Sequence, residues 1–187
     1  MNSLLKLNLG CGENRLAGYV NVDKFGNPDI RHDLETFPWP WVSDSVREIR
    51  LSHVLEHLGE TTETYFGIIK EMYRICVPNA EIHITVPHPR HDDFLGDPTH
   101  VRSVTPQGLD HFSKSKNRDW IKGQYANTPL GVYLDVDFEI TGVNYGLDPE
   151  WAEKLNKGEI TNAQIDQAFR NFNNVVKEIK IVLRVVK

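Results

Sequence analysis

The stretch LLKLNLGCGENRLAGYVNVD, residues 4–23, predicts that the chain begins with two strands of an open α/β sheet. Residues 4–9 are mostly apolar and lead into Gly10 and Gly12, as expected of a buried parallel strand that ends in a tight turn. Residues 18–23 form a second β-prone run. Glycines at the carboxyl end of a strand let the backbone approach a ligand closely, and ligands of such sheets bind at this edge. We therefore expect a binding site at the glycine turn.

Apolar patterning further along the chain predicts alternating strands and helices. Strands are expected at residues 29–34, 46–54, 81–86, 133–145 and 175–186, and helices at 60–76, after Thr105, at 148–155 and at 161–172. The run 87–102 is rich in Pro, His and Asp and is expected to be a long loop. This alternation indicates a Rossmann-like α/β fold, with a mainly parallel seven-stranded sheet and a C-terminal antiparallel hairpin.

The length and the net charge of the chain restrict the classes of function that it can have. The chain has 187 residues, 40% of them hydrophobic and 25% charged, which is typical of a single globular domain. We expect one domain over residues 1–187, with an insertion at about 147–174. The formal net charge of -5 provides no global positive field, so a nucleic-acid partner is disfavoured.

The N-terminal segment and the cysteines indicate the cellular compartment of the protein. The start, MNSLLKLNLG, has too short an apolar run for a signal peptide, and no run of about 18 apolar residues predicts a membrane span. Cys11 and Cys76 form neither a C-x-x-C pair nor a zinc pattern, so we expect two reduced thiols. A cytoplasmic protein without a membrane partner is the expectation.

Two aspartates follow strand ends near the expected site. Asp23 is placed to accept hydrogen bonds from the ribose hydroxyls of a nucleoside cofactor, although a turn aspartate is the alternative. Asp33 precedes the segment FPWPW and is placed either to accept from an adenine amino group or to cap a turn beside core aromatics. The aromatic candidates to cover the adenine face are Phe37, Trp39 and Trp41.

A dinucleotide site fits the sequence poorly. The position of the third glycine of the dinucleotide fingerprint is occupied by Arg15. Asp23 also follows the glycines too soon, because the acid of that fingerprint lies about 20 residues downstream. We therefore disfavour an NAD-dependent enzyme.

The order LNLGCG, GYVNVD, HDLE, LSHVLEHL and RICVPNAEIHITVPHP resembles the class I S-adenosylmethionine-dependent methyltransferases. It is most similar to the compact branch of small predicted methyltransferases, in which G-Y-x-N-x-D follows the glycine turn almost at once. The resemblance covers residues 4 to about 112. It implies S-adenosylmethionine as cofactor and these surrounding residues: Gly10, Cys11 and Gly12 at the methionine end, Asp23 at the ribose, Asp33 and Leu34 at the adenine, and Ser52 and His53 beside the sulfonium.

The interval between Glu13 and Val22 is too short for the full helix of the larger family, because a parallel crossover usually takes a dozen residues or more. We expect a shortened first crossover helix. That side of the pocket is then either exposed to solvent or closed by a partner subunit. A homo-oligomer is therefore possible. The methionine carboxylate then relies on turn amides and on Arg15.

The pattern H-x-x-E-H begins at His53, and more histidines follow from the next expected strand end. The candidate general bases are His53, His57, His88, His91 and His100. Small-RNA 2′-O-methyltransferases and ubiquinone-pathway O-methyltransferases are similar here, with E-x-x-E-H and a later histidine as metal ligands. The possible metal set is therefore His53, Glu56, His57 and His100. Because His53 replaces the first Glu, a metal is not favoured.

The reaction that follows is transfer of a methyl group from S-adenosylmethionine to an O or N atom of an unidentified acceptor: a small molecule, a sugar or a polymer end. The alternative is a non-catalytic S-adenosylmethionine-binding partner subunit. We expect the insertion at 147–174 to lie over the acceptor side. Its Trp151, Phe169 and Phe172 are expected to bury against the sheet rather than recognise substrate.

Overall fold

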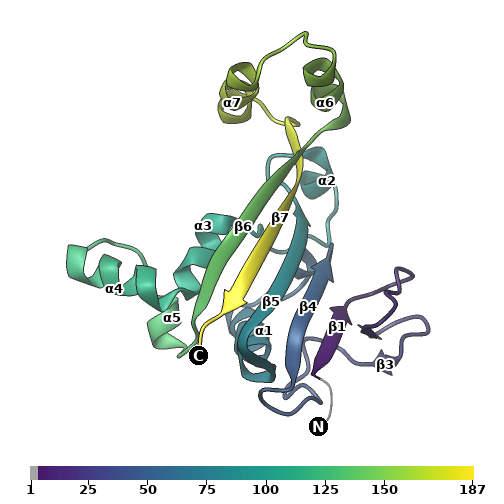
Figure 1. Cartoon of the computed structure of the whole chain (residues 1–187), viewed down its shortest axis with the longest axis vertical. Helices are drawn as coiled ribbons and strands as arrows, with labels where there is room; N and C mark the ends of the chain where they lie inside the picture. Colours follow the sequence, from purple (N-terminus) through teal and green to yellow (C-terminus); the bar gives the residue numbers. More distant parts are fainter. Residues whose placement is uncertain (1–3) are drawn as a thin grey trace.

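Seven strands form one sheet in the computed structural model, which describes residues 4–187. They are β1 (Leu5–Leu9), β2 (Val20–Asp23), β3 (Ile30–Arg31), β4 (Val46–Ser52), β5 (Cys76–Pro87), β6 (Phe138–Leu147) and β7 (Val176–Val185). The order across the sheet is β3-β2-β1-β4-β5-β7-β6 (Figure 1). The first five strands pair in parallel, whereas β7 runs antiparallel to both β5 and β6. The expected sheet with its C-terminal antiparallel hairpin is confirmed. Residues 1–3 of the expected domain lie outside the described residues.

The helices differ greatly in length and burial. The described elements are η1 (Leu55–His57), α1 (Thr62–Ile75), α2 (Asp92–Leu95), α3 (Pro106–Leu109), η2 (Asp110–Phe112), α4 (Lys114–Gly123), α5 (Leu130–Tyr133), α6 (Pro149–Asn156) and α7 (Asn162–Asn171). The longest, α1, begins after Thr61, whose side chain accepts from the Thr64 amide. Its apolar face packs fully buried Ile68, Ile69 and Met72 into the core beneath the sheet.

Several element boundaries differ from the sequence expectations. The expected loop 87–102 contains the short helix α2. Strand β5 starts at Cys76, directly after α1, and a register shift against β4 accommodates the extra residues. Helix α4 was not expected, because its only buried residue is Asn117 and it has no apolar period. The expected strand from Tyr133 begins only at Phe138, since Tyr133 ends α5 and Leu134 is the C-cap of that helix.

The connection between β1 and β2, residues 10–19, consists of turns and contains no helix. The Asn21 side chain on β2 holds it in place. Its Oδ1 accepts from the Leu16 amide at 2.8 Å and from Asn8 Nδ2 at 2.9 Å. Side-chain hydrogen bonds thus replace the packing of a crossover helix, and the shortening expected from the sequence is complete.

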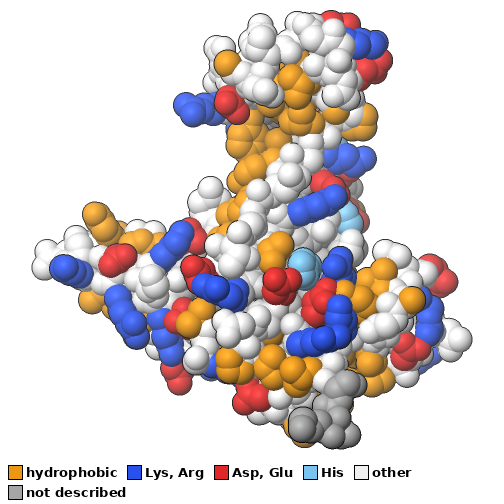
Figure 2. Space-filling view, viewed as in Figure 1, with side chains coloured by type: hydrophobic (Ala, Val, Ile, Leu, Met, Phe, Trp, Pro, Cys, Tyr) orange, Lys and Arg blue, Asp and Glu red, His pale blue; other side chains and the backbone are white. Residues whose placement is uncertain are grey.

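The ends of β6 and β7 extend past the rest of the sheet and carry α6 and α7 at their tip (Figure 1). We call residues 147–174 the arm. Figure 2 shows hydrophobic side chains along the arm and the strand ends that carry it. Trp151 and Phe169 are half-buried, whereas Phe172 is 59% exposed. The expectation that Phe172 buries against the sheet is therefore wrong.

Two other expectations concern the described residues as a whole. Cys11 and Cys76 are both free and buried, as expected from their spacing. Within residues 4–187, no helix has both the length and the apolar character needed to cross a membrane.

Candidate functional site

A pocket lies where β1, β2 and β4 end and where the chain leaves β3. Its walls contain five of the residues expected around a cofactor: Gly10, Asp23, Asp33, Leu34 and His53. Because parallel strands end at one edge of the sheet, residues far apart in the sequence meet here. The pocket is completed by Lys24, Phe25, His32, Val54, His57 and Leu58.

The glycine turn, residues 10–12, lies at this edge of the sheet. Gly10 has φ +65°, and a Cβ there would lie 2.5 Å from a side-chain carbon of Val54. Gly12 has φ +48°, and no atom lies within 4 Å of where its Cβ would be. The backbone at Gly12 is therefore open to a ligand, whereas Gly10 is required by packing.

The two aspartates are held by backbone amides. Asp23 Oδ2 accepts from the Gly12 amide at 2.8 Å, and its Oδ1 accepts from the Phe25 amide at 2.9 Å. Asp33 Oδ1 accepts from the Glu35 amide at 3.0 Å, while its Oδ2 lies 3.6 Å from Lys24 Nζ. A carboxylate oxygen has two lone pairs, so each oxygen bound by one amide retains a lone pair for a ligand hydroxyl or amine.

Four expected contacts do not line the pocket. Cys11 is 5% exposed, and burial raises the pKa of its thiol, so it is an inert core residue. Gly12 and Ser52 lie at the same edge but outside the pocket walls. Arg15 Nη2 forms an ion pair with Asp29, and its Nη1 donates to the Asn27 carbonyl at 2.5 Å. Arg15 thus supports the connection after β1 rather than facing the pocket.

The aromatic residue at the pocket is Phe25, not one from the segment FPWPW. Trp39 and Trp41 are 2% and 7% exposed and belong to the core. Phe37 packs over Gly67 of α1, away from this pocket. Phe25 is 70% exposed, with Lys24 Nζ 5.4 Å from its ring centroid. The expectation for the FPWPW aromatics is therefore wrong, because Trp39 and Trp41 belong to the core and Phe37 lies beside α1.

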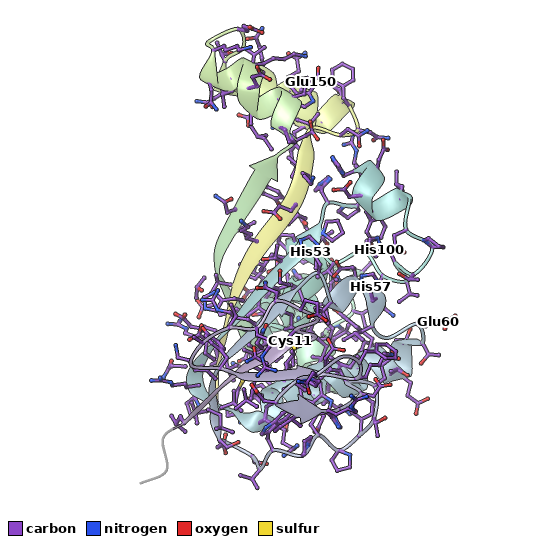
Figure 3. The ribbon with its side chains drawn as sticks, turned by 90° about the vertical axis from the view of Figure 1, so that its right-hand side faces the viewer. Cys11, His53, His57, Glu60, His100 and Glu150 are labelled. Carbon is purple, nitrogen blue, oxygen red and sulfur yellow. The ribbon has the colours of Figure 1, made fainter. Side chains whose placement is uncertain are left out.

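His53 follows β4 at the pocket edge (Figure 3). Its φ of +55° is uncommon for a residue with a side chain, and its amide donates to the Thr85 carbonyl at 2.8 Å. Nδ1 lies 3.5 Å from Glu56 Oε1, and Nε2 lies 3.7 Å from Glu178 Oε2. Glu56, and then Glu178, raise the pKa of this half-exposed imidazole.

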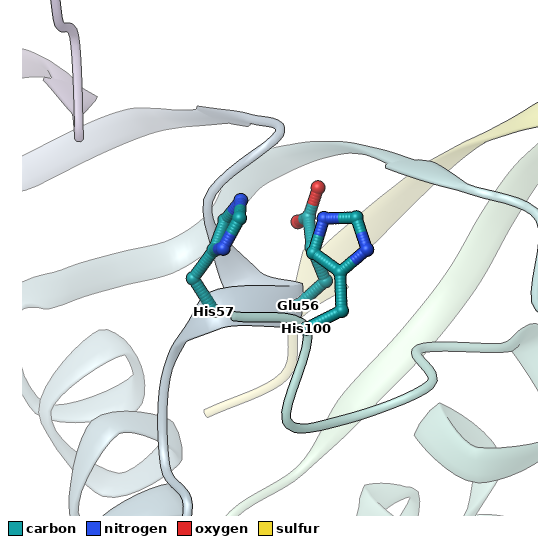
Figure 4. A group of neighbouring side chains, drawn as sticks. All are labelled: Glu56, His57 and His100. Atoms are coloured by element: carbon teal, nitrogen blue, oxygen red, sulfur yellow. The ribbon is translucent and has the colours of Figure 1, made fainter. Parts of the chain in front are cut away.

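Glu56, His57 and His100 converge beside the pocket (Figure 4). One potential ligand atom from each lies within 4.8 Å of those of the other two. The rings of His57 and His100 have centroids 4.6 Å apart, and His100 also stacks on Phe94. Of the four residues expected as possible metal ligands, the structure groups these three and leaves His53 outside.

No protein-family model matches the sequence, and a search of curated proteins gives no match. Solved structures do match. A SAM-dependent methyltransferase from Archaeoglobus fulgidus aligns over 98% of this chain and 86% of its own, with a TM-score of 0.62 and 17% identity. The 1,6-didemethyltoxoflavin-N1-methyltransferase from Burkholderia thailandensis, solved with S-adenosylhomocysteine, aligns over 100% and 72%, with a TM-score of 0.54 and 10% identity.

A SAM-dependent methyltransferase from Methanosarcina mazei aligns over 100% of this chain and 94% of its own, with a TM-score of 0.51 and 13% identity. The chain has the SAM-dependent methyltransferase fold. The resemblance seen in the sequence is thus confirmed at the level of fold. On this methyltransferase fold the pocket occupies the edge where strands β1, β2 and β4 end.

Two of the expected catalytic histidines lie elsewhere on the methyltransferase fold. His88 is 9% exposed and packs on Phe169 of α7, and burial lowers the pKa of its imidazole. His91 Nε2 lies 3.2 Å from Asp148 Oδ2, while its Nδ1 accepts from the Asp93 amide at the start of α2. Neither lines the pocket, and both bind the arm to the loop after β5.

Proposed function

We propose that this chain binds S-adenosylmethionine in the pocket and transfers its methyl group to an O or N atom of an acceptor. One observation carries the proposal: Gly10, Asp23 and Asp33, from three neighbouring strand ends, line a single pocket on a methyltransferase fold. Fold alone does not select a function, so the pocket chemistry is the support. The acceptor is a small molecule, a sugar or a polymer end.

Different pocket residues contact different parts of the cofactor. Asp23, whose oxygens are held by two backbone amides, accepts from the ribose hydroxyls. Asp33 and Leu34 face the adenine, and Phe25 covers an adenine face with its exposed ring. The methionine end extends out of the pocket along the edge of the sheet to the open backbone at Gly12. Cys11 and Ser52 contribute by position at this edge rather than by side-chain contact.

The sulfonium of the bound cofactor supplies an electrophilic methyl group. The chain's contribution is to hold an acceptor lone pair in line with that methyl group and to remove the acceptor's proton. His53 is the residue placed to take this proton, because its half-exposed imidazole lines the pocket. This placement favours catalysis over the alternative of a non-catalytic partner subunit.

Isothermal titration with S-adenosylhomocysteine, S-adenosylmethionine and NAD tests the cofactor. We expect both adenosyl compounds to bind and NAD not to bind. Asp23→Asn and Phe25→Ala are each expected to weaken S-adenosylhomocysteine binding about tenfold or more, because they remove a charged acceptor and a stacking face. Phe172→Ala is the matched control, since Phe172 is similarly exposed but lies on the arm.

Two results would overturn the proposal. One is binding of NAD in place of S-adenosylhomocysteine. The other is unchanged S-adenosylhomocysteine affinity in both pocket variants, each shown to be folded by circular dichroism. Transfer of a labelled methyl group from S-adenosylmethionine into candidate acceptors then tests catalysis, and the folded His53→Ala variant is expected to lose most of that transfer.

A further inference from the structure

The Glu56 side chain is buried without a hydrogen-bond partner. Its side chain is 1% exposed, and neither Oε1 nor Oε2 has a hydrogen-bond donor among residues 4–187. The nearest basic atom, His53 Nδ1, lies 3.5 Å from Oε1. A buried carboxylate left in this state is strongly destabilising unless a cation compensates it. Its surroundings therefore call for a positive charge.

The backbone brings a second segment to this carboxylate. The Glu56 carbonyl accepts from the amides of Val101 at 3.0 Å and Arg102 at 3.2 Å. These bonds fasten the segment DPTH, residues 97–100, against η1. As a result, His100 and Glu56, 44 positions apart in the chain, present their side chains to the same space (Figure 4).

Bonds on the far side of both imidazoles determine which nitrogen carries the lone pair. The Thr99 hydroxyl donates to Asp97 Oδ1 at 2.6 Å, so it accepts from His57 Nδ1, 2.9 Å away. His100 Nδ1 lies 2.9 Å from the Phe94 carbonyl, which only accepts, so this nitrogen carries the proton. The lone pair of each ring is thereby on Nε2. Outer hydrogen bonds of this kind orient histidines that ligate metals.

We propose that Glu56, His57 and His100 bind one divalent transition-metal ion. Two neutral imidazoles and one carboxylate suit zinc, manganese, iron(II) or cobalt(II) better than magnesium or calcium, which prefer oxygen ligands. The first-position residue His53, which disfavours a metal in the sequence pattern, is not needed by this set. Three protein ligands leave coordination positions for water or for an acceptor oxygen.

The position of the site connects it with the proposed function, on which this further role rests. His57 belongs to the cluster and also lines the pocket proposed for S-adenosylmethionine. A bound ion would therefore lie at the edge of the methyl-donor pocket, where it would orient an acceptor oxygen. Binding of the ion itself requires only the three side chains.

Cobalt(II) alone is the probe. The full chain, stripped with a chelator and dialysed, is titrated with Co²⁺ while its visible absorption and its heat of binding are recorded. We expect one equivalent to bind. Glu56→Gln and His100→Gln are each expected to weaken binding about 100-fold, and Thr99→Val about tenfold through the lost orientation of His57. His83→Gln is the matched control, because His83 pairs with Glu81 on β5, outside the cluster.

The outcomes separate this proposal from the proposed function. Absence of saturable Co²⁺ binding, or equal affinity in wild type and in folded His100→Gln, overturns the metal site. S-adenosylhomocysteine binding is measured on the same samples. If that nucleoside binds and cobalt does not, only the metal site fails; if cobalt binds and the nucleoside does not, only the proposed cofactor fails.

Discussion

At Gly10 the backbone conformation and a neighbouring side chain both exclude a Cβ. The φ of +65° and the 2.5 Å approach to Val54 act together, so we expect Gly10→Ala to destabilise the protein by ~2–4 kcal/mol and to abolish S-adenosylhomocysteine binding. Gly18→Ala is the control: φ is +80°, but no atom lies within 4 Å of the added carbon. Its cost is ~1–2 kcal/mol. Equal losses in denaturant unfolding would show that the Val54 contact does not matter.

The sequence located pocket residues where the residue type and its position at a strand end together suggest one role. Asp23 and Asp33 were placed at the pocket because acids at adjacent strand ends must meet at one edge. Phe25 was missed, because one exposed aromatic in a turn has no periodic signal. Trp39 was misassigned because an aromatic beside a strand end suits a core and a ligand pocket equally well. The partnerless state of Glu56 depends on every neighbour, so only the structure reveals it.

Strand β4 is connected to β1 and to the turn before β2 through one carboxylate, Glu48. Lys6 Nζ lies 2.6 Å from Oε2, the Tyr19 hydroxyl donates to Oε1, and Arg50 Nε lies 3.2 Å from Oε1. Partial burial alone would raise the pKa of Glu48. The bonds from Lys6 and Tyr19, with the Lys6 charge, outweigh it and lower the pKa to about 2. Folding therefore favours the ionised form of Glu48.

The stability from Glu48 should depend on pH. Because its folded pKa lies below the ordinary value of 4.5, its contribution is complete above pH 4.5 and disappears as the pH falls toward 2. We expect Glu48→Gln to lower the free energy of unfolding by ~1–3 kcal/mol at pH 7, and the difference from wild type to shrink between pH 4.5 and 2. Glu81→Gln, at an exposed position on β5, is the control. A pH-independent difference in urea unfolding would contradict this account.

Element prediction depended on how strongly each segment is patterned. Helix α1 and the parallel strands bury regular apolar positions, so their spacing predicted them. Helix α4 escaped prediction because it is largely polar and rests on Asn117, whose Oδ1 accepts from the Val132 amide. Tyr133, the last residue of α5, was assigned to the start of a strand because a short apolar run does not distinguish helix from strand. The contact of α5 with α4 decides between them, and that contact is tertiary.

On the scale of the whole molecule, the two sides of the sheet differ in how far they cover the edge at which the pocket lies. Near β1 and β2, the connection without a helix leaves the glycine turn open. Near β6 and β7, the arm extends beyond the same edge and contacts the loop after β5 (Figure 1). That loop continues into the segment that carries His100. The arm thus lies at the pocket edge, and the expectation that this insertion covers the acceptor side stays a prediction.

Arg90 also holds the arm in this position, beside His88 and His91. Arg90 Nη1 donates to the carbonyls of Phe169 and Arg170 at 3.0 and 3.2 Å, and Nη2 donates to the Phe172 carbonyl at 2.8 Å. These are carbonyls at the end of α7 that lack helical partners. We expect Arg90→Ala to speed amide hydrogen exchange in residues 162–172 about tenfold or more while S-adenosylhomocysteine binding is retained, because the pocket lies on other strands. Lys154→Ala, which removes only an exposed ion pair on α6, should leave that exchange unchanged. Equal protection of α7 in Arg90→Ala and wild type would mean that the contacts of His88 and His91, with the packing of Ile165 and Ala168, position the arm without Arg90.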